Sequence, residues 1–215
     1  MRRAPATLLL IRHGETAWNA EHRIQGSLDI PLSAAGFWQA GRLAERLAVE
    51  RIDAIYASDL ARAWMTAEPL AARLGLDPRA DARLRERCFG VFEGHTLDEI
   101  AARWPDEFAA WRERDPAWAM PEGESGAEFI ERVNAALHDI ACEWAGATVA
   151  VFAHGGVLDV AYRTARALAW DAPREHVMAN AAINRIAAFT PPLRMHIVDW
   201  GDIAHLSEAR DETLT

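Results

Sequence analysis

The sequence predicts an α/β protein in which helices cover both faces of a mainly parallel, doubly wound sheet, giving three layers in the order α/β/α. Short apolar runs, typical of buried strands, alternate along the chain with segments whose apolar residues recur every three or four positions. Strands that alternate with helices favour a parallel sheet, because each crossover helix packs on a face of the sheet. No repeat, low-complexity tract or linker interrupts the pattern, so we expect a single domain over residues 1–215.

The first part of the chain contains two strand–helix units. Residues 7–12 are a short apolar run and predict a buried strand. A helix follows, with Ser33 as its cap. Its apolar residues share one face: Phe37, Ala40, Leu43 and Leu47. Residues 52–56 predict the second strand, and the helix after it is opened by Ser58-Asp59 and stopped by Gly75.

The middle of the chain differs, because helix-capping signals flank a tryptophan-rich stretch broken by prolines. Thr96-Leu-Asp-Glu99 and Ser125-Gly-Ala-Glu128 both have the capping-box pattern of a helix start. We interpret residues 95–125 as a helical excursion from the core that serves as a lid. Its aromatic side chains are either core beneath the lid or an apolar wall for the substrate, and we hypothesise the second role for at least one of them. They are Trp104, Phe108, Trp111 and Trp118.

The last part of the chain supplies another strand–helix unit and a pair of strands. Residues 148–153 predict a buried strand, and a helix over 157–168 follows it. Residues 183–189 and 194–200 predict two final strands around a turn at Pro191-Pro192. These segments complete the expected alternation.

The composition excludes several classes of function. With a formal net charge of −9, the chain is poorly suited to bind nucleic acid or an anionic membrane surface. All 23 lysine-or-arginine positions hold arginine, which excludes mechanisms that need a lysine amine but leaves planar guanidinium groups for phosphate. Two distant cysteines, Cys88 and Cys142, indicate a reducing compartment, and the apolar run ending at Ile11 is too short for a signal peptide. We therefore expect a cytoplasmic protein.

Polar side chains with complementary chemistry follow the predicted strands. Arg12 and His13 come after the first strand, Arg62 follows the second, and His154 follows the strand over 148–153. Ligands of doubly wound folds bind beyond the carboxyl ends of the strands, so we expect these groups to meet there. Glu86 lies in a glycine-bearing loop near the lid.

One reaction uses all of these groups. A neutral imidazole at His13 attacks phosphorus, and Arg12, Arg62 and a protonated His154 meet the charge on the phosphoryl oxygens. Glu86 gives a proton to the leaving oxygen and then serves as the base for the attacking water. The eight histidines show no HxH or HExxH pair, so we expect neither a metal nor another cofactor.

At this point a resemblance is apparent. IRHGETAWN, residues 11–19, resembles the signature of the histidine phosphatase superfamily, which has the phosphoglycerate-mutase-like fold. Further matching segments are IQGSLDIPLSAAG (24–36), YASDLARAWMTA (56–67), LRERCFGVFEG (84–94), PEGES (121–125), VFAHGG (151–156) and GDIAHL (201–206). The resemblance therefore spans nearly the whole chain.

The resemblance assigns a role to each matching residue. It implies that His13 is the phosphorylated nucleophile and that Glu86 is the proton donor. It also implies a set of phosphate- or substrate-binding residues: Arg12, Asn19, Gln25, Gly26, Ser27, Arg62, His154 and Gly155.

The family holds both phosphatases and mutases, and the lid helps to choose between them. The mutases carry a longer, more basic insertion between the acid and the second histidine, whereas here 68 residues separate Glu86 from His154. The segment over 95–125 carries Arg103, Arg112 and Arg114 against eight acidic residues, which poorly suits a phosphoglycerate. The chain most resembles small bacterial phosphatases of the broad-specificity, ribazole-phosphate and phosphoserine types.

We therefore expect a phosphomonoester hydrolase that acts on a small soluble phosphorylated metabolite. A cofactor-dependent phosphoglycerate mutase is the first alternative, and a non-catalytic regulator with the same fold is the second. The sequence is silent on the oligomeric state, with a homodimer as one option.

Overall fold

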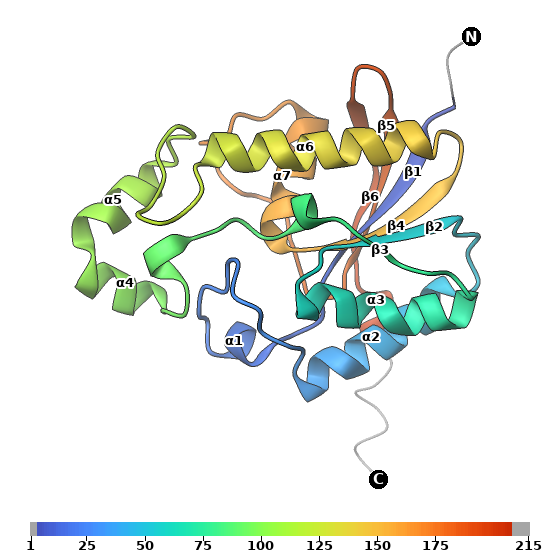
Figure 1. Ribbon diagram of the computed structural model, residues 1–215, viewed down its shortest axis with the longest axis horizontal. Coiled ribbons are helices and arrows are strands. Elements are labelled where there is room, and N and C mark those ends of the chain that lie inside the picture. Colours follow the sequence, from blue (N-terminus) through green and yellow to red (C-terminus); the bar gives the residue numbers. More distant parts are fainter. Residues whose placement is uncertain (1–3, 208–215) are drawn as a thin grey trace.

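The structure, a computed structural model, describes residues 4–207 (Figure 1). Residues 1–3, at the start of the signal-peptide-like segment, and residues 208–215, at the end of the predicted domain, lie outside this range. The strands are β1 (Ala6–Arg12), β2 (Ala54–Ala57), β3 (Arg79–Ala80), β4 (Thr148–Ala153), β5 (Ile183–Phe189) and β6 (Arg194–Asp202). The helices are α1 (Ala17–Ala20), α2 (Ala34–Leu47), α3 (Ala61–Leu74), α4 (Leu97–Arg103), α5 (Pro105–Glu113), α6 (Gly126–Glu143) and α7 (Gly155–Arg166).

The six strands form one sheet in the order β3-β2-β4-β1-β5-β6. The pairs β3–β2, β2–β4 and β4–β1 are parallel, and the pairs β1–β5 and β5–β6 are antiparallel. The predicted mainly parallel α/β sheet is therefore confirmed. The last two strands form an antiparallel hairpin, because only a short turn joins them and a parallel pair needs a long crossover.

Alternation along β1 explains the three layers. Leu8 and Leu10 point to one face of the sheet and pack in a core with α6 and α7. Leu9 and Ile11 point to the other face and pack with α2 and α3. Because both faces are covered, the buried part of the strand needs apolar residues at successive positions, as Leu8 to Ile11 supply. Figure 1 shows α6 on one side of the sheet and α2 with α3 on the other.

Helix α2 begins where the sequence predicts and buries Ala40, Leu43 and Leu47 as expected, but its first turn differs. Ser33 is its cap, with the side-chain oxygen accepting from the Gly36 N–H at 3.1 Å. The prediction that Phe37 faces the core is wrong, since Phe37 is 50% exposed. Gly36 is buried instead, because the first turn of α2 packs directly on the backbone of Glu15 in the loop after β1. Apolar spacing alone did not determine whether Gly36 or Phe37 lies on the buried face at the start of the helix.

Other boundaries differ by a few residues. Helix α3 has Leu60 as its cap residue with no side-chain hydrogen bond, so the expected opening by Ser58-Asp59 is wrong. Its predicted end at Gly75 is confirmed, with Gly75 in the left-handed region at φ 65°. Helix α7 starts at Gly155, two residues before the predicted start, so His154 is its cap residue.

The segment over 95–125 lies outside the sheet, as the sequence predicts. Helices α4 and α5 occupy most of it and project to the left in Figure 1. Both predicted capping boxes are present, Thr96 with Glu99 before α4 and Ser125 with Glu128 before α6. An apolar cluster of its own, around Phe92, holds the lid segment to the rest of the molecule.

We predict opposite effects for two alanine substitutions in α2. A Cβ at Gly36 would collide with the backbone carbonyl of Glu15, so Gly36→Ala should lower the free energy of unfolding by about 1–3 kcal/mol. A Cβ at Gly41 would meet no atom within 4 Å, so Gly41→Ala should raise that free energy by about 0.5–1 kcal/mol through helix propensity. Urea unfolding measures both. Changes of the same sign would contradict the packing of α2 on the loop after β1.

Candidate active site

The register of three parallel strands brings the strand-end residues together. Arg12 pairs with Ala153 across β1 and β4, so the residues that follow, His13 and His154, leave the sheet side by side. The His13 N–H donates to the Ala153 carbonyl at 2.9 Å, and the two imidazole centroids lie 5.2 Å apart. The last residue of β2 pairs with Phe152, which places Ser58 next to His154.

His13 has the protonation state that a nucleophile needs. Its Nδ1 lies 2.7 Å from the Gly14 carbonyl oxygen, which can only accept, so Nδ1 carries the ring proton. The lone pair is therefore on Nε2. Burial holds the pKa of His13 well below its ordinary value, and the positive charges of Arg12 and Arg62 lower that pKa further. His13 is thus a neutral imidazole with Nε2 available.

His154 is also neutral, which corrects one expectation. Arg62 Nε–H donates to His154 Nδ1 at 3.2 Å, so the ring proton is on Nε2, which lies 2.9 Å from Ser58 Oγ. Burial, followed by the charge of Arg62, holds the pKa of His154 well below its ordinary value. The expected protonated His154 is therefore wrong for this structure. The ring orients Arg62 rather than adding a positive charge.

Arg62 and Arg12 provide the positive donors. Arg62 is fully buried and donates to the Gly26 and Leu28 carbonyls at 2.7 Å each, which holds the loop around Gly26 against the site. Burial lowers the pKa of Arg62 to about 10, so the group stays charged at neutral pH. Arg12 donates through one terminal nitrogen to the Met178 carbonyl, while its buried Nε has no hydrogen-bond partner among residues 4–207. An unpaired buried N–H of a cation is a ready donor for an anion.

Glu86 reaches the site through the start of α7. Its Oε2 accepts from the Gly156 N–H at 3.0 Å, and its Oε1 accepts from the Arg87 N–H at 2.9 Å. Any Cβ at Gly156 would collide with Oε1 of this carboxylate, so only glycine permits the approach. A Cβ at Gly155 would lie 3.6 Å from Arg12 Nε and 3.9 Å from Glu86 Oε2, which places the acid and the free donor around one point.

A cavity of about 350 Å³ collects most of the predicted site residues. Its lining includes Arg12, His13, Asn19, Gln25, Gly26, Arg62, Glu86 and Gly155. His154 lies beneath the cavity, fully buried. Ser27 differs from the other predicted residues, because its side chain donates to the Glu93 carboxylate at 3.0 Å and lies outside the lining.

The cavity also contains residues that the sequence analysis missed. Arg23, Ile24, Phe89, Gly156, Arg174 and Met178 are among them. Arg174 lies in the long connection between α7 and β5, which has neither helical nor strand periodicity. Two of the lid aromatics take different positions: Trp104 packs in the cluster around Phe92, whereas Trp111 contacts that cluster and also lines the cavity. Of the four lid aromatics, Trp111 is thus the one in this lining.

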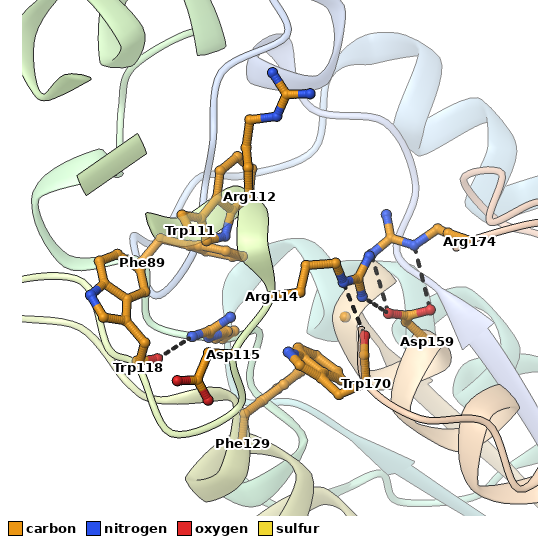
Figure 2. Close-up of a pocket in the computed structure, with 12 residues that line it drawn as sticks. Phe89, Trp111, Arg112, Arg114, Asp115, Trp118, Phe129, Asp159, Trp170 and Arg174 are labelled. Atoms are coloured by element: carbon orange, nitrogen blue, oxygen red, sulfur yellow. Dashed lines mark hydrogen bonds and ion pairs between the residues drawn. The ribbon is translucent and has the colours of Figure 1, made fainter. Parts of the chain in front are cut away.

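A second cavity, of about 280 Å³, lies under the lid segment and shares lining residues with the first (Figure 2). Arg87, Arg112, Arg114 and Arg174 line it, against Asp115 and Asp159. Of the eight acidic residues of the lid segment, only Asp115 belongs to this lining. Seven of the eight acidic residues therefore lie outside this lining, so the net charge of the segment does not describe the charge of the cavity.

Residues 4–207 contain neither a membrane-spanning helix nor a cluster of side chains that could hold a metal ion. These residues contain no helix long and apolar enough to cross a membrane. In the same range, no group of three or more histidine, cysteine, aspartate or glutamate side chains is arranged to hold a metal ion.

Comparisons with known proteins agree with this geometry. The family model described as the histidine phosphatase superfamily (branch 1) matches residues 8–201. A probable phosphoglycerate mutase GpmB of Klebsiella pneumoniae (strain 342) is 38% identical, over 94% of this chain and 96% of its own length. The solved structure of YhfR from Bacillus stearothermophilus is 33% identical, covers 94% of this chain and 99% of its own, and has a TM-score of 0.85. A mycobacterial glucosyl-3-phosphoglycerate phosphatase is 33% identical with the same coverage and a TM-score of 0.79.

We predict that burial of His13 makes the folded protein sensitive to acid. Below the ordinary pKa of 6.5 the unfolded chain binds a proton at this side chain, whereas the folded chain does not. The free energy of unfolding therefore includes the full contribution of this histidine above that pH. It falls as the pH drops, by at most about 1.4 kcal/mol per pH unit for each such histidine. Between pH 7.5 and 5.0, urea unfolding should show a larger loss for the wild type than for His13→Asn. Equal losses would contradict a buried neutral His13.

Proposed function

Because the chain belongs to the histidine phosphatase superfamily, we propose that it hydrolyses phosphomonoesters through a phosphohistidine at His13. One observation carries the proposal: a neutral imidazole with its Nε2 lone pair available lines a cavity that also contains two buried guanidinium groups and a carboxylate. Nucleophile, charge-stabilising donors and proton donor are the three parts that phosphoryl transfer through a covalent intermediate requires.

In the first step the Nε2 lone pair attacks phosphorus and the bond from phosphorus to the ester oxygen breaks. Glu86, in its acid form, gives its proton to that oxygen, so the product leaves as an alcohol. Arg12 donates through its unpaired Nε–H. Arg62 uses three of its five N–H groups on Gly26, Leu28 and His154, which leaves two for the phosphoryl oxygens.

In the second step water attacks the phosphohistidine. Glu86, now a carboxylate, takes the proton from the water, the bond from phosphorus to Nε2 breaks, and inorganic phosphate leaves. The electron pair returns to Nε2, and Glu86 is again an acid. The N-terminus of α7 begins at Gly155 in the wall of the cavity, and its positive end stabilises negative charge there throughout both steps. No metal or cofactor enters the scheme.

Hydrolysis is favoured over the mutase reaction by the short lid and by the phosphatase among the similar structures. A mutase has to keep water from its phosphohistidine, and here only α4, α5 and their connections separate Glu86 from α6. The name of the Klebsiella relative favours the mutase, which therefore remains the second candidate. Arg12, His13, Arg62 and Glu86 all line the cavity, which argues against a non-catalytic regulator. We place the reaction in the cytoplasm, consistent with a sequence that has only two widely spaced cysteines, Cys88 and Cys142, and we propose a small phosphorylated metabolite as substrate.

We predict that the purified protein releases inorganic phosphate and forms little 2-phosphoglycerate when given 3-phosphoglycerate and the bisphosphate primer, with a chelator present. The wild type should carry an acid-labile phosphate label after rapid quenching. His13→Ala should lose both the label and the turnover, because the variant lacks the imidazole whose Nε2 takes the phosphoryl group. Isomerisation faster than phosphate release would assign the mutase reaction instead. A label retained in His13→Ala would move the nucleophile elsewhere.

We also predict that Glu86→Gln separates substrates by their leaving groups. Alkyl phosphates need a proton on the departing oxygen, so kcat on glycerol phosphate should fall by about 100-fold or more. Nitrophenolate leaves without protonation, so kcat on nitrophenyl phosphate should fall far less. Initial rates on the two esters measure the difference. Equal losses would remove Glu86 from the role of proton donor.

A further inference from the structure

The cavity under the lid segment has a positive lining in a protein of net negative charge. Four arginines line it against two aspartates, while the chain as a whole has a formal net charge of −9. In Figure 2 the side chains of Arg114 and Arg174 converge on Asp159 beside the ring of Trp170. This concentration of positive charge is not explained by transfer of the phosphoryl group at His13.

A single buried carboxylate serves several of these cations. Asp159 is fully buried, and its Oδ2 lies 3.1 Å from Arg163 Nε, 3.2 Å from an Arg174 terminal nitrogen and 3.5 Å from an Arg114 terminal nitrogen. One negative charge thus faces three guanidinium groups. The guanidinium groups therefore carry more positive charge than Asp159 balances. Because they are partly shielded from water, they would attract an anion strongly.

Arg87 adds to this excess from the other side of the cavity. Its side chain is buried, and it donates to two backbone carbonyls, those of Glu124 at 2.9 Å and Trp118 at 3.4 Å. Carbonyl oxygens satisfy its hydrogen bonds but carry no net charge. Burial lowers the pKa of Arg87, which reflects the cost of keeping this cation away from water.

The rest of the lining consists largely of aromatic faces. Trp111, Trp118, Trp170, Phe89 and Phe129 line the cavity. The guanidinium carbons of Arg114, Arg163 and Arg87 lie 5.3, 5.8 and 5.9 Å from the ring centroid of Trp170. Aromatic faces of this kind favour a flat or apolar group between the charged ends of a ligand.

The two cavities adjoin each other and share part of their walls. Phe89, Trp111, Gly156 and Arg174 line both, and the Gly156 N–H is the group that holds Glu86 beside the reacting atoms. A substrate whose phosphate lies at His13 would therefore extend its leaving group past Gly156 toward Arg174 and Arg114.

We propose that this cavity binds a second anionic group of the substrate, carried on a ring or similarly flat apolar scaffold, and that Arg114 and Arg174 contact that group. The inference rests on the proposed function, because it takes the phosphate to lie at His13. Asp159 is a positioning residue: it holds the two guanidinium groups at the wall of the cavity. The substrate class is thus a phosphomonoester with a second acidic function on its leaving group.

The test compares two esters that differ only in that acidic function. The two esters, 4-(carboxymethyl)phenyl phosphate and 4-ethylphenyl phosphate, have similar leaving groups, because the methylene insulates the phenol from the carboxylate. In the corresponding pair of 3-substituted esters, the carboxymethyl or ethyl group leaves the ring in a different direction. Binding to the His13→Ala variant is measured by calorimetry at constant ionic strength, so that no turnover is needed. Hydrolysis of the same esters by the wild type is measured as kcat/KM.

In at least one pair the acid should bind 10-fold or more tightly than its neutral partner, the usual effect of a charge-assisted hydrogen bond. Arg114→Gln and Arg174→Gln, each added to His13→Ala, should reduce this advantage about 10-fold, and Arg174→Lys should retain part of it. Arg103→Gln is the matched control, because Arg103 also lies in the lid segment but lies over Trp104, outside either lining. It should retain the full advantage. Circular dichroism melting checks that each variant is folded.

The outcomes separate this inference from the proposed function. Hydrolysis of both members with an advantage below twofold in both pairs, or an advantage unchanged by both arginine variants, would overturn the second anion site and leave the phosphatase intact. An arginine-dependent binding advantage without phosphate release by the wild type would support the second anion site and overturn the phosphatase.

Discussion

The pairing of Arg12 with Ala153 across β1 and β4 is the constraint on which the site depends. Parallel strands in this register release His13 and His154 at the same edge, with their rings 5.2 Å apart. A slip of one residue would turn one ring to the opposite face of the sheet. The apolar side chains of β1 pack in the cores on both faces of the sheet and hold the strand in this register, so the side chains that form the core also help to set the distance between the imidazoles.

Charge and burial act together on these rings. Burial raises the cost of a proton on His13, and the charges of Arg12 and Arg62 raise it further, so the nucleophile stays neutral. The same guanidinium groups attract the phosphoryl oxygens. Keeping such cations buried is costly, and the cost is offset for Arg62 by the carbonyls of Gly26 and Leu28 and by His154. The loop around Gly26 is therefore both a wall of the cavity and part of what keeps Arg62 in place.

The features that could be predicted from the sequence are those set by local residue patterns and by position at the end of a strand. Arg12, His13, Arg62 and Glu86 were found because strand ends and loop motifs mark them, and the sheet follows from the buried runs. Arg174 was missed, because only its ion pair with Asp159, made in the folded chain, brings it to the cavity. The protonated state expected for His154 failed for a related reason: a donor from Arg62, distant in sequence, decides its tautomer. Contacts between single side chains that are far apart in the sequence cannot be predicted from local residue patterns.

The lid segment shows why charge counts mislead when the fold is unknown. Counted along the sequence, the lid segment has eight acidic residues and three arginines. In the fold, however, its two faces have different surroundings. Asp98, Asp106 and Glu113 are exposed to water, where a charge costs little, whereas Arg114 turns inward to Trp170 and Asp159. A negative outer face keeps an acidic protein dispersed in solution, while a positive inner face selects what enters. Net charge and pocket charge are thus independent quantities here, and only the second bears on the substrate.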